Sequence, residues 1–379
     1  MSTDPTRTAL GTWSGGRFMH FGEPLDDERF LALITPDAQI STVLTADVYG
    51  QGEADTLLGR ALTRPVAPSR DNVCVVGAVG HDFYTGTREG AKGFPRFTDP
   101  RLRSPDQYAA YLRDATQRSL ERIGIDAFDL LLLHNPDRTG YSSETVWDGM
   151  EALKQAGLTR RIGVAPGPAN GFTLDLLDCF ERFGARIDWA MVILNPLEPW
   201  PGELVLDAAA AQDIKVITRV VDYGGLFGGD VTTATELADF DHRKFRPEGW
   251  IGAGLERIAQ MAPIAEAYGL TLLQLACLWN LAHPAVLSVV PTLVQEKGGR
   301  PVEEKRAELA ALPPVQLLTS GEVERIRQLG DNTGCMALKG ASPVHEGDER
   351  PDQWAISDHL LEVAARWQID PSRDLVKVH

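Results

Sequence analysis

Two side chains that can move protons stand at the ends of short apolar segments. Tyr49 follows the β-rich segment 41–45, and His134 directly follows the apolar segment 129–133. A tyrosine hydroxyl, with an ordinary pKa of about 10, is a ready proton donor at neutral pH, and a histidine titrates near neutrality. We therefore predict that both residues are catalytic and that their polar atoms lie within about 7 Å of each other, close enough to hold one substrate oxygen. The alternatives are that Tyr49 only seals a strand end and that His134 is a structural histidine bonded to the backbone.

A second group of side chains has the chemistry of a substrate pocket. Arg219 follows the segment 215–218 and would bind an anionic or polyhydroxylated group, unless it forms an ion pair with Asp222. Aromatic faces suit sugars and ring compounds, although a single aromatic residue in a loop is more often part of ordinary packing. We predict that the substrate contacts Arg219, Asp47 and the aromatic residues Trp13, Phe83, Tyr84 and Trp200.

Histidine and cysteine spacing does not favour a metal centre. The four cysteines are scattered without a CxxC pair, which is typical of a reducing compartment. Short ligand spacings such as HxH or HExxH are absent from the sequence. We therefore predict no metal at the four residues that could otherwise hold one, His20, Asp47, His81 and His134.

Strand-like segments recur along the chain with helical patterns between them. The helical pattern is clearest after 104–107, a capping box with proline at the first helical position, where apolar and aromatic residues recur with helical spacing from Tyr108 to Ala115. Continuous apolar strands are typical of a parallel sheet that is covered on both faces. The predicted strands are 8–13, 41–45, 73–76, 129–133, 161–164, 189–194, 215–218 and 286–290.

The repeated order of strand and helix predicts an α/β fold, a (β/α)8 TIM barrel over residues 1–330. A doubly wound open sheet is the structural alternative. Two regions lie outside the repeat, namely a long loop after the seventh strand, 227–250, and a C-terminal extension, 331–379. We expect the extension to pack on the barrel, and both regions are candidates for lids over its carboxyl-terminal mouth.

Composition restricts the partners that we expect. The chain has 379 residues, of which 43% are hydrophobic and 24% charged, as in an ordinary folded protein. A net charge of −16 and an isoelectric point near 5.0 argue against a nucleic-acid partner. The sequence has no signal-peptide pattern and no apolar segment of spanning length, so we expect a cytoplasmic protein with no membrane partner. The expected partner is a small-molecule substrate, and no pattern specifies an oligomeric state.

Several motifs resemble those of one enzyme family. The segment TADVYGQGEADTLLG at 45–59 resembles the aldo/keto reductase signature, roughly DTAxxYGxGxSExxLG. LLLHNPD at 131–137 is similar to the family's fourth-strand motif, and ILNPL at 193–197 is similar to its sixth-strand motif. The resemblance implies a barrel that transfers hydride between NADP(H) and a carbonyl group, with Tyr49 as the proton donor and His134 beside it.

Two residues that the resemblance implies are absent. Family members tune their tyrosine with a buried Lys and Asp pair, and the matching positions are Ala78 and Leu44. The joint loss is self-consistent, because either partner alone would be a buried unpaired charge at a cost of about 3 kcal/mol or more. His81, three residues beyond Ala78, is a candidate catalytic residue that would supply the missing positive charge, unless it is a solvent-facing loop residue.

Positions that the resemblance assigns to the nicotinamide cofactor are also changed. Side chains that usually hold the carboxamide are replaced by Ala165, Pro166 and Met191. Arg219 stands where an aromatic ring often stacks on the nicotinamide, and the turn 291–300 lacks the usual glycine of the phosphate-binding turn. We expect NADP to bind weakly or not at all, with Arg219 and Arg300 as the remaining candidate contacts.

Three functions follow from these observations. The preferred hypothesis is a non-redox isomerase, lyase or hydrolase that uses Tyr49 and His134 as acid and base on a carbonyl-containing or sugar-like molecule, because the residues that are kept serve proton transfer in general. The alternative is an NAD(P)H-dependent aldo/keto reductase with altered tuning residues. The third is a binding barrel without catalysis.

Overall fold

Eight parallel strands form a barrel in the computed structural model, which describes residues 4–90, 93–167, 172–350 and 352–377. Each strand pairs with the next in chain order, and a parallel bridge between Thr8 and Val289 joins the first strand to the last. The strands are β1 (Ala9–Gly11), β2 (Thr42–Leu44), β3 (Cys74–Val79), β4 (Leu130–His134), β5 (Ile162–Ala165), β6 (Trp189–Ile193), β7 (Lys215–Arg219) and β8 (Val286–Val290). All eight predicted strands are confirmed to within three residues at either end, and the open-sheet alternative is wrong.

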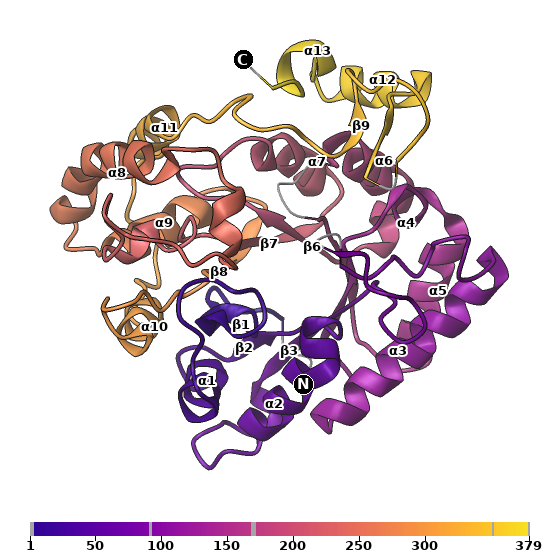
Figure 1. The fold of residues 1–379 in the computed structure, drawn as a ribbon, viewed down its shortest axis with the longest axis horizontal. Helices are drawn as coiled ribbons and strands as arrows, with labels where there is room; N and C mark the ends of the chain where they lie inside the picture. The colour runs from indigo at the N-terminus through magenta and orange to yellow at the C-terminus, as the bar shows by residue number, and fades with distance from the viewer. Residues whose placement is uncertain (1–3, 91–92, 168–171, 351, 378–379) are drawn as a thin grey trace.

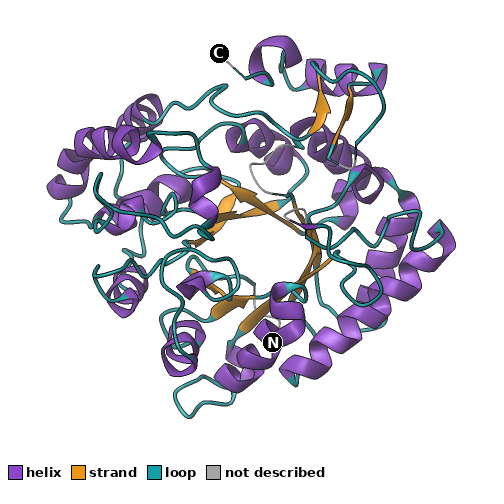
Figure 2. Cartoon of the chain, viewed as in Figure 1, coloured by secondary structure: helices purple, strands orange, loops and turns teal. Residues whose placement is uncertain are grey.

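Helices surround the barrel on its outside, as Figures 1 and 2 show. They are α1 (Asp27–Ile34), α2 (Glu53–Leu62), α3 (Tyr108–Ile123), α4 (Arg138–Ser142), α5 (Glu144–Gln155), α6 (Thr173–Phe183), α7 (Leu206–Ala211), α8 (Trp250–Ala267), α9 (Leu272–Leu281), α10 (Val302–Ala310) and α11 (Ser320–Leu329). Among the described residues, no single helix is long and apolar enough to cross a membrane, and only α8 and α9 taken together, with an 85° bend between them, reach that length and composition.

Local sequence signals explain the helix that covers β3 and β4. Ser104 and Gln107 form the predicted capping box, in which the Gln107 side chain accepts a hydrogen bond of 3.1 Å from the Ser104 amide. Tyr108 begins α3, and Gly124 ends it with a φ of 79°, a left-handed conformation that favours glycine. The predicted apolar face is buried against the barrel and α5, so the pattern, the caps and the packing agree.

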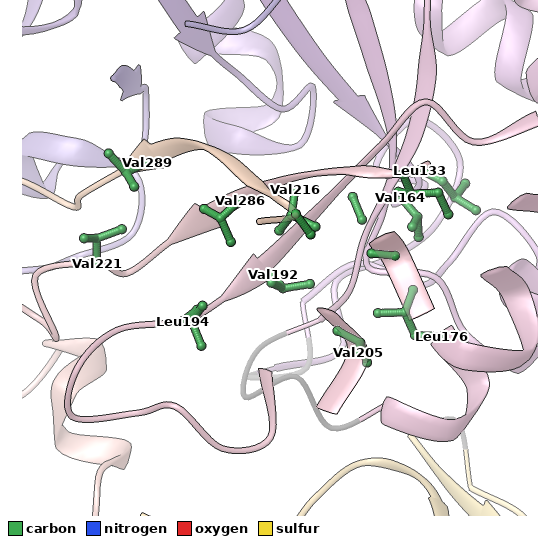
Figure 3. Close-up of a cluster of buried hydrophobic side chains, with 14 of the residues drawn as sticks. Leu133, Val164, Leu176, Val192, Leu194, Val205, Val216, Val221, Val286 and Val289 are labelled. Carbon is green, nitrogen blue, oxygen red and sulfur yellow. The ribbon is translucent and has the colours of Figure 1, made fainter. Parts of the chain in front are cut away.

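The barrel has two separate apolar cores, one on each face of the sheet. Side chains alternate along each strand, so that Val192 and Val216 point outward into the layer between strands and helices, where they meet Leu176 and Val205 (Figure 3). Met191 and Ile217, their chain neighbours, point into the barrel. The interior cluster consists of Ala9, Trp13, Leu44, Ala46, Cys74, Val76, Ala78, Leu130, Leu132, Ala165, Trp189, Met191, Ile217 and Val290. In the part of the chain that the structure describes, the barrel interior beneath the mouth is therefore apolar.

The C-terminal extension packs on the outside of the barrel next to α6 (Figure 1). It contains the two-stranded parallel sheet β9 (Gly340–Ser342) and β10 (Gln353–Ala355), followed by α12 (Asp358–Arg366) and α13 (Pro371–Asp374). Asp175 on α6 accepts hydrogen bonds from the Trp354 indole and the Ala341 amide, both at 3.0 Å. These contacts fix the extension to the α6 side, and a role over the mouth stays a prediction.

Candidate active site

Tyr49 and His134 meet at the carboxyl ends of β2 and β4. Tyr49 begins a short turn in which Gly50 and Gln51 have positive φ values of 58° and 54°, and this turn directs the chain from β2 into α2. His134 is the last residue of β4. The two rings lie edge to face with their centroids 5.8 Å apart. The structure therefore brings the two predicted catalytic side chains together at one end of the barrel.

The apolar barrel interior governs the hydroxyl of Tyr49. Trp13 packs edge to face on the tyrosine ring at a centroid distance of 6.4 Å, and Leu44 and Ala78 lie in the same cluster. Burial raises the pKa of Tyr49 to about 12, against the opposing effect of the positive charge on Arg219. Tyr49 is therefore a neutral proton donor at physiological pH.

His134 is neutral for the same reason. Its side chain is buried, and its Nδ1 has no hydrogen-bond partner among the residues that the structure describes. Burial, together with the positive charges of Arg96 and Arg219, lowers the pKa of His134 to about 3. The imidazole can hold a substrate oxygen by a hydrogen bond, but it is not a cationic acid at neutral pH.

His81 lies beside His134 and does not carry the predicted positive charge. The two imidazole rings are 5.1 Å apart, and His81 is only 8% exposed, so it is not a solvent-facing residue either. Burial, followed by the positive charge of Arg96, lowers the pKa of His81 well below its ordinary value. The prediction that His81 replaces the missing lysine charge is therefore wrong, because the site that buries the ring also keeps it neutral.

Arg96 is the cation that sequence reasoning missed. The loop after β3 folds back in an antiparallel bridge between His81 and Arg96, which places Nη1 of Arg96 2.9 Å from Nδ1 of His81. The same Nδ1 lies 3.1 Å from the carbonyl oxygen of Phe94. The side-chain amide nitrogen of Asn135 lies 3.1 Å from Nε2 of His81. Arg96, His81 and Asn135 thus hold one another behind His134. No local sequence motif indicates Arg96 as a site residue, because only the fold of the loop brings it beside His81.

Arg219 supplies a second positive charge at the mouth. It is the last residue of β7 and donates hydrogen bonds to the carbonyl oxygens of Pro166, at 3.1 Å, and Gly167, at 3.3 Å. Within the described ranges it has no carboxylate within ion-pair distance. Asp222 instead accepts the backbone amides of Thr292 and Leu293 at 3.0 and 3.1 Å, so the alternative ion pair between Arg219 and Asp222 is wrong. The guanidinium charge acts on both Tyr49 and His134.

Three predicted substrate contacts lie in a different cluster, on the α3 side of the mouth. Phe83 and Tyr84 stack on each other at 4.0 Å, and the Tyr84 hydroxyl accepts a hydrogen bond of 3.2 Å from Arg122. Asp47 is fully buried without a hydrogen-bond partner for either oxygen among the described residues. Burial and the neighbouring Asp55 raise the pKa of Asp47 well above its ordinary range. Among the described residues, Tyr84 contacts α3 through Arg122 and Tyr111, so the cluster lies on the α3 side of Tyr49, and the predicted substrate contacts of Phe83, Tyr84 and Asp47 stay predictions.

Two further predicted contacts have structural partners. The Trp200 indole donates a hydrogen bond of 2.7 Å to the carbonyl of Asp374, so it anchors the C-terminal extension. Arg300 donates to Glu308 at 2.6 Å and to the Gly228 carbonyl at 3.0 Å, so it joins the loops after β7 and β8. The substrate contact of Trp200 and the cofactor contact of Arg300 stay predictions, beside these structural contacts.

A cavity of about 600 Å³ lies between the loops that follow β1, β7 and β8. These loops share the carboxyl-terminal end of the barrel with Tyr49 and His134, because all eight strands are parallel. The loop after β7 occupies 220–249 up to the start of α8. Charged lining residues include Asp230, Asp241, Arg243 and Glu296.

Comparison with known proteins agrees with this arrangement. The aldo/keto reductase family model matches residues 8–327. A 6-dehydroglucose reductase from Agrobacterium fabrum is 25% identical over 264 residues, which cover 67% of this chain and 73% of that protein. A probable voltage-gated potassium channel subunit beta from Arabidopsis thaliana is 22% identical over 340 residues, which cover 84% and 93%.

Solved structures show the same fold. A glycerol dehydrogenase from Gluconobacter oxydans superposes with a TM-score of 0.65 at 23% identity and covers 87% of this chain and 92% of its own. An aldo/keto reductase from Klebsiella pneumoniae, solved in complex with NADP and acetate, superposes with a TM-score of 0.56 at 19% identity and covers 86% and 95%. The family match spans the whole barrel, including Tyr49 and His134, and the chain therefore belongs to the aldo/keto reductase family.

Proposed function

We propose that this chain is a nicotinamide-dependent oxidoreductase that interconverts a carbonyl group and an alcohol on a small polyhydroxylated molecule. The observation that carries the proposal is that the ring centroids of Tyr49 and His134 lie 5.8 Å apart, beside the positive charge of Arg219, in a chain of this family. The comparisons favour this redox alternative over the non-redox hypothesis. The names of a 6-dehydroglucose reductase and a glycerol dehydrogenase among the relatives support a sugar-like or polyol substrate.

Tyr49 has the properties of the proton donor in the reductive direction. A bound nicotinamide dinucleotide would supply a hydride to the carbonyl carbon. The hydroxyl of Tyr49 would then give its proton to the carbonyl oxygen, so that the alcohol forms and the tyrosinate recovers a proton from water. The raised pKa of Tyr49, about 12, keeps the donor protonated across the physiological range but makes proton abstraction from an alcohol slow.

His134 and Arg219 would orient and stabilise the reacting oxygen. Neutral His134 can donate one hydrogen bond to the carbonyl, and its ring position is fixed by His81 at 5.1 Å. The Arg219 guanidinium would stabilise negative charge that develops on the oxygen, an effect that is large in a site from which water is excluded. Arg219 would therefore act on the substrate oxygen, whereas Leu44 and Ala78 leave Tyr49 without a charged tuning pair.

The residues at the mouth offer different contacts to the two ends of a dinucleotide. At the nicotinamide end, Ala165 and Met191 are buried in the interior cluster and offer no amide, which leaves the planar Arg219 cation as the group that could flank the ring. At the other end, the cavity between the loops after β1, β7 and β8 offers space and polar groups. Gly22 lets the loop after β1 pack against the loop after β8 at this cavity, since a Cβ there would lie 2.3 Å from the Gln295 carbonyl oxygen.

A labelled-hydride experiment tests the proposed reaction. The purified chain is incubated with NADH or NADPH deuterated at the transferable position and with a panel of sugar-like and small aliphatic aldehydes and ketones. We expect deuterium on the new alcohol carbon by mass spectrometry, and loss of this product in Tyr49→Phe. Conversion of a substrate without cofactor, and without deuterium transfer, would overturn the proposal in favour of the non-redox reaction.

A further inference from the structure

The cavity between the loops after β7 and β8 occupies the place where (β/α)8 barrels commonly bind phosphate groups. A phosphate site would present free cations or backbone amides to the cavity. The lining of this cavity instead includes the carboxylates of Glu23, Asp230, Glu236, Asp241 and Glu296. Its two basic lining residues are Arg243 and Lys297.

Most of the cations near this cavity are already bound to carboxylates of the chain. Arg243 is 1% exposed and donates to Asp241 at 2.8 Å and to Glu296 at 3.1 Å. Lys305 lies 2.8 Å from Asp230 and donates to the Val294 carbonyl at 2.7 Å. In the described part of the chain, only the exposed Lys297 lines the cavity without a carboxylate within ion-pair distance.

One buried oxygen at the cavity lacks a partner. The Asp230 side chain is 7% exposed, and its Oδ2 accepts Lys305 and the Arg300 amide, at 2.8 and 3.1 Å. Its Oδ1 is buried and accepts no hydrogen bond from any described residue. Gly299 permits this arrangement, because a Cβ there would lie 2.4 Å from Oδ2 of Asp230. A buried carboxylate oxygen without a donor calls for a hydroxyl or amine, not for another anion.

We infer that this cavity binds the unphosphorylated ribose of a nicotinamide adenine dinucleotide, so that the chain prefers NAD(H) to NADP(H). The inference rests on the proposed function and adds its coenzyme preference. Ribose hydroxyls can donate to Asp230 and Glu296, as acidic residues do in other sites selective for the unphosphorylated coenzyme. A 2′-phosphate would bring about two negative charges against these carboxylates, and among the described lining residues only Lys297 is free to receive them.

Binding measurements on the full-length chain test the preference without relying on turnover. NADH and NADPH are titrated separately by calorimetry, and we expect the dissociation constant of NADPH to be higher by roughly tenfold or more because of the like charges. Glu296→Gln removes one of these charges, while Arg243 keeps Asp241 as a partner. The variant should therefore lower the ratio of the NADPH dissociation constant to the NADH dissociation constant by about threefold. The matched control Glu362→Gln removes the same charge from the exposed face of α12 and should leave the ratio unchanged.

Each outcome of these titrations decides between the two claims. Equal affinity for both dinucleotides, or tighter binding of NADPH, would overturn the inference while the proposed oxidoreductase stands. Failure of both dinucleotides to bind would overturn the proposed function and the inference with it. If Glu296→Gln unfolds, which thermal melting would show, the wild-type ratio alone still decides the preference.

Discussion

Two neighbouring regions of the barrel mouth differ in the charge state of their buried ionisable groups. Around Tyr49 the barrel interior is apolar, and burial holds Tyr49, His81 and His134 in their neutral forms. Between the loops after β7 and β8, Arg243 and Asp241 are equally buried, but their ion pair raises the pKa of Arg243 and lowers that of Asp241, so both stay charged. The difference indicates that the reaction region is built for neutral proton donation, whereas the adjoining cavity is built to select a ligand by charge.

Removing the Tyr49 hydroxyl should have the largest effect on the reaction region. Tyr49→Phe deletes only the proton donor, and we expect turnover to fall by about 10²- to 10⁴-fold, as for other general acids, with little change in thermal stability. The measurement is kcat on a substrate found with the deuterated cofactors. Tyr268→Phe, which removes a hydroxyl bonded to Glu322 on the barrel exterior, is the matched control and should keep full activity. Unchanged turnover in Tyr49→Phe would mean that Tyr49 has only a structural role.

Removing the guanidinium of Arg243 should have the largest effect on the cavity between the loops after β7 and β8. Arg243→Leu would leave Asp241 and Glu296 buried without their partner, at a cost of about 3 to 5 kcal/mol in the free energy of unfolding. Urea denaturation measures this loss. Arg300→Leu is the control, because the pair with Glu308 is partly exposed and should contribute at most about 1 kcal/mol. Equal losses in the two variants would contradict the view that Arg243 organises the cavity.

Acid should destabilise the reaction region through its neutral histidines. The pKa of His134 is lowered to about 3 in the folded chain, whereas an unfolded histidine titrates near 6.5, so below that value only the unfolded state takes up the proton. Stability is therefore fully present above about pH 6.5 and falls toward pH 3, by up to about 1.4 kcal/mol per pH unit for this group.

Urea denaturation at several pH values compares wild type with His134→Asn. The variant should show a shallower acid slope, whereas His20→Asn at an exposed position should show the wild-type slope. Parallel slopes for wild type and His134→Asn would mean that His134 is charged in the folded chain.

Changing the shape but not the charge of Arg219 should have the smallest effect. Arg219→Lys keeps a cation near Tyr49 but loses the planar group that bonds to Pro166 and Gly167. We expect kcat/KM to fall by about three- to tenfold. Arg219→Met, which loses the charge as well, should fall further. If the two variants are equal, the charge of Arg219 has no part in the reaction.

The parts of this arrangement that sequence could predict are those set by local pattern. Apolar runs gave the eight strands, and residues at strand ends such as Tyr49 and His134 must meet when parallel strands close into a barrel. The charge state of His81 was mispredicted because it depends on burial under a folded loop. Arg96 was missed because an antiparallel bridge, without a local motif, brings it to His81. The hydrogen bond of Trp200 to Asp374 could not be predicted because the two residues are far apart in the sequence.

The pH dependence of the two reaction directions tests the central claim most directly, that Tyr49 is a neutral donor in an apolar site. With a pKa of about 12, kcat/KM for carbonyl reduction should stay level from about pH 6 to about pH 10, because the donor remains protonated. Alcohol oxidation needs the tyrosinate, so its kcat/KM should rise about tenfold per pH unit over the same range. A fall in the reduction rate, or a plateau in the oxidation rate, below about pH 9 would show that Tyr49 is activated by a charge, and would contradict the account.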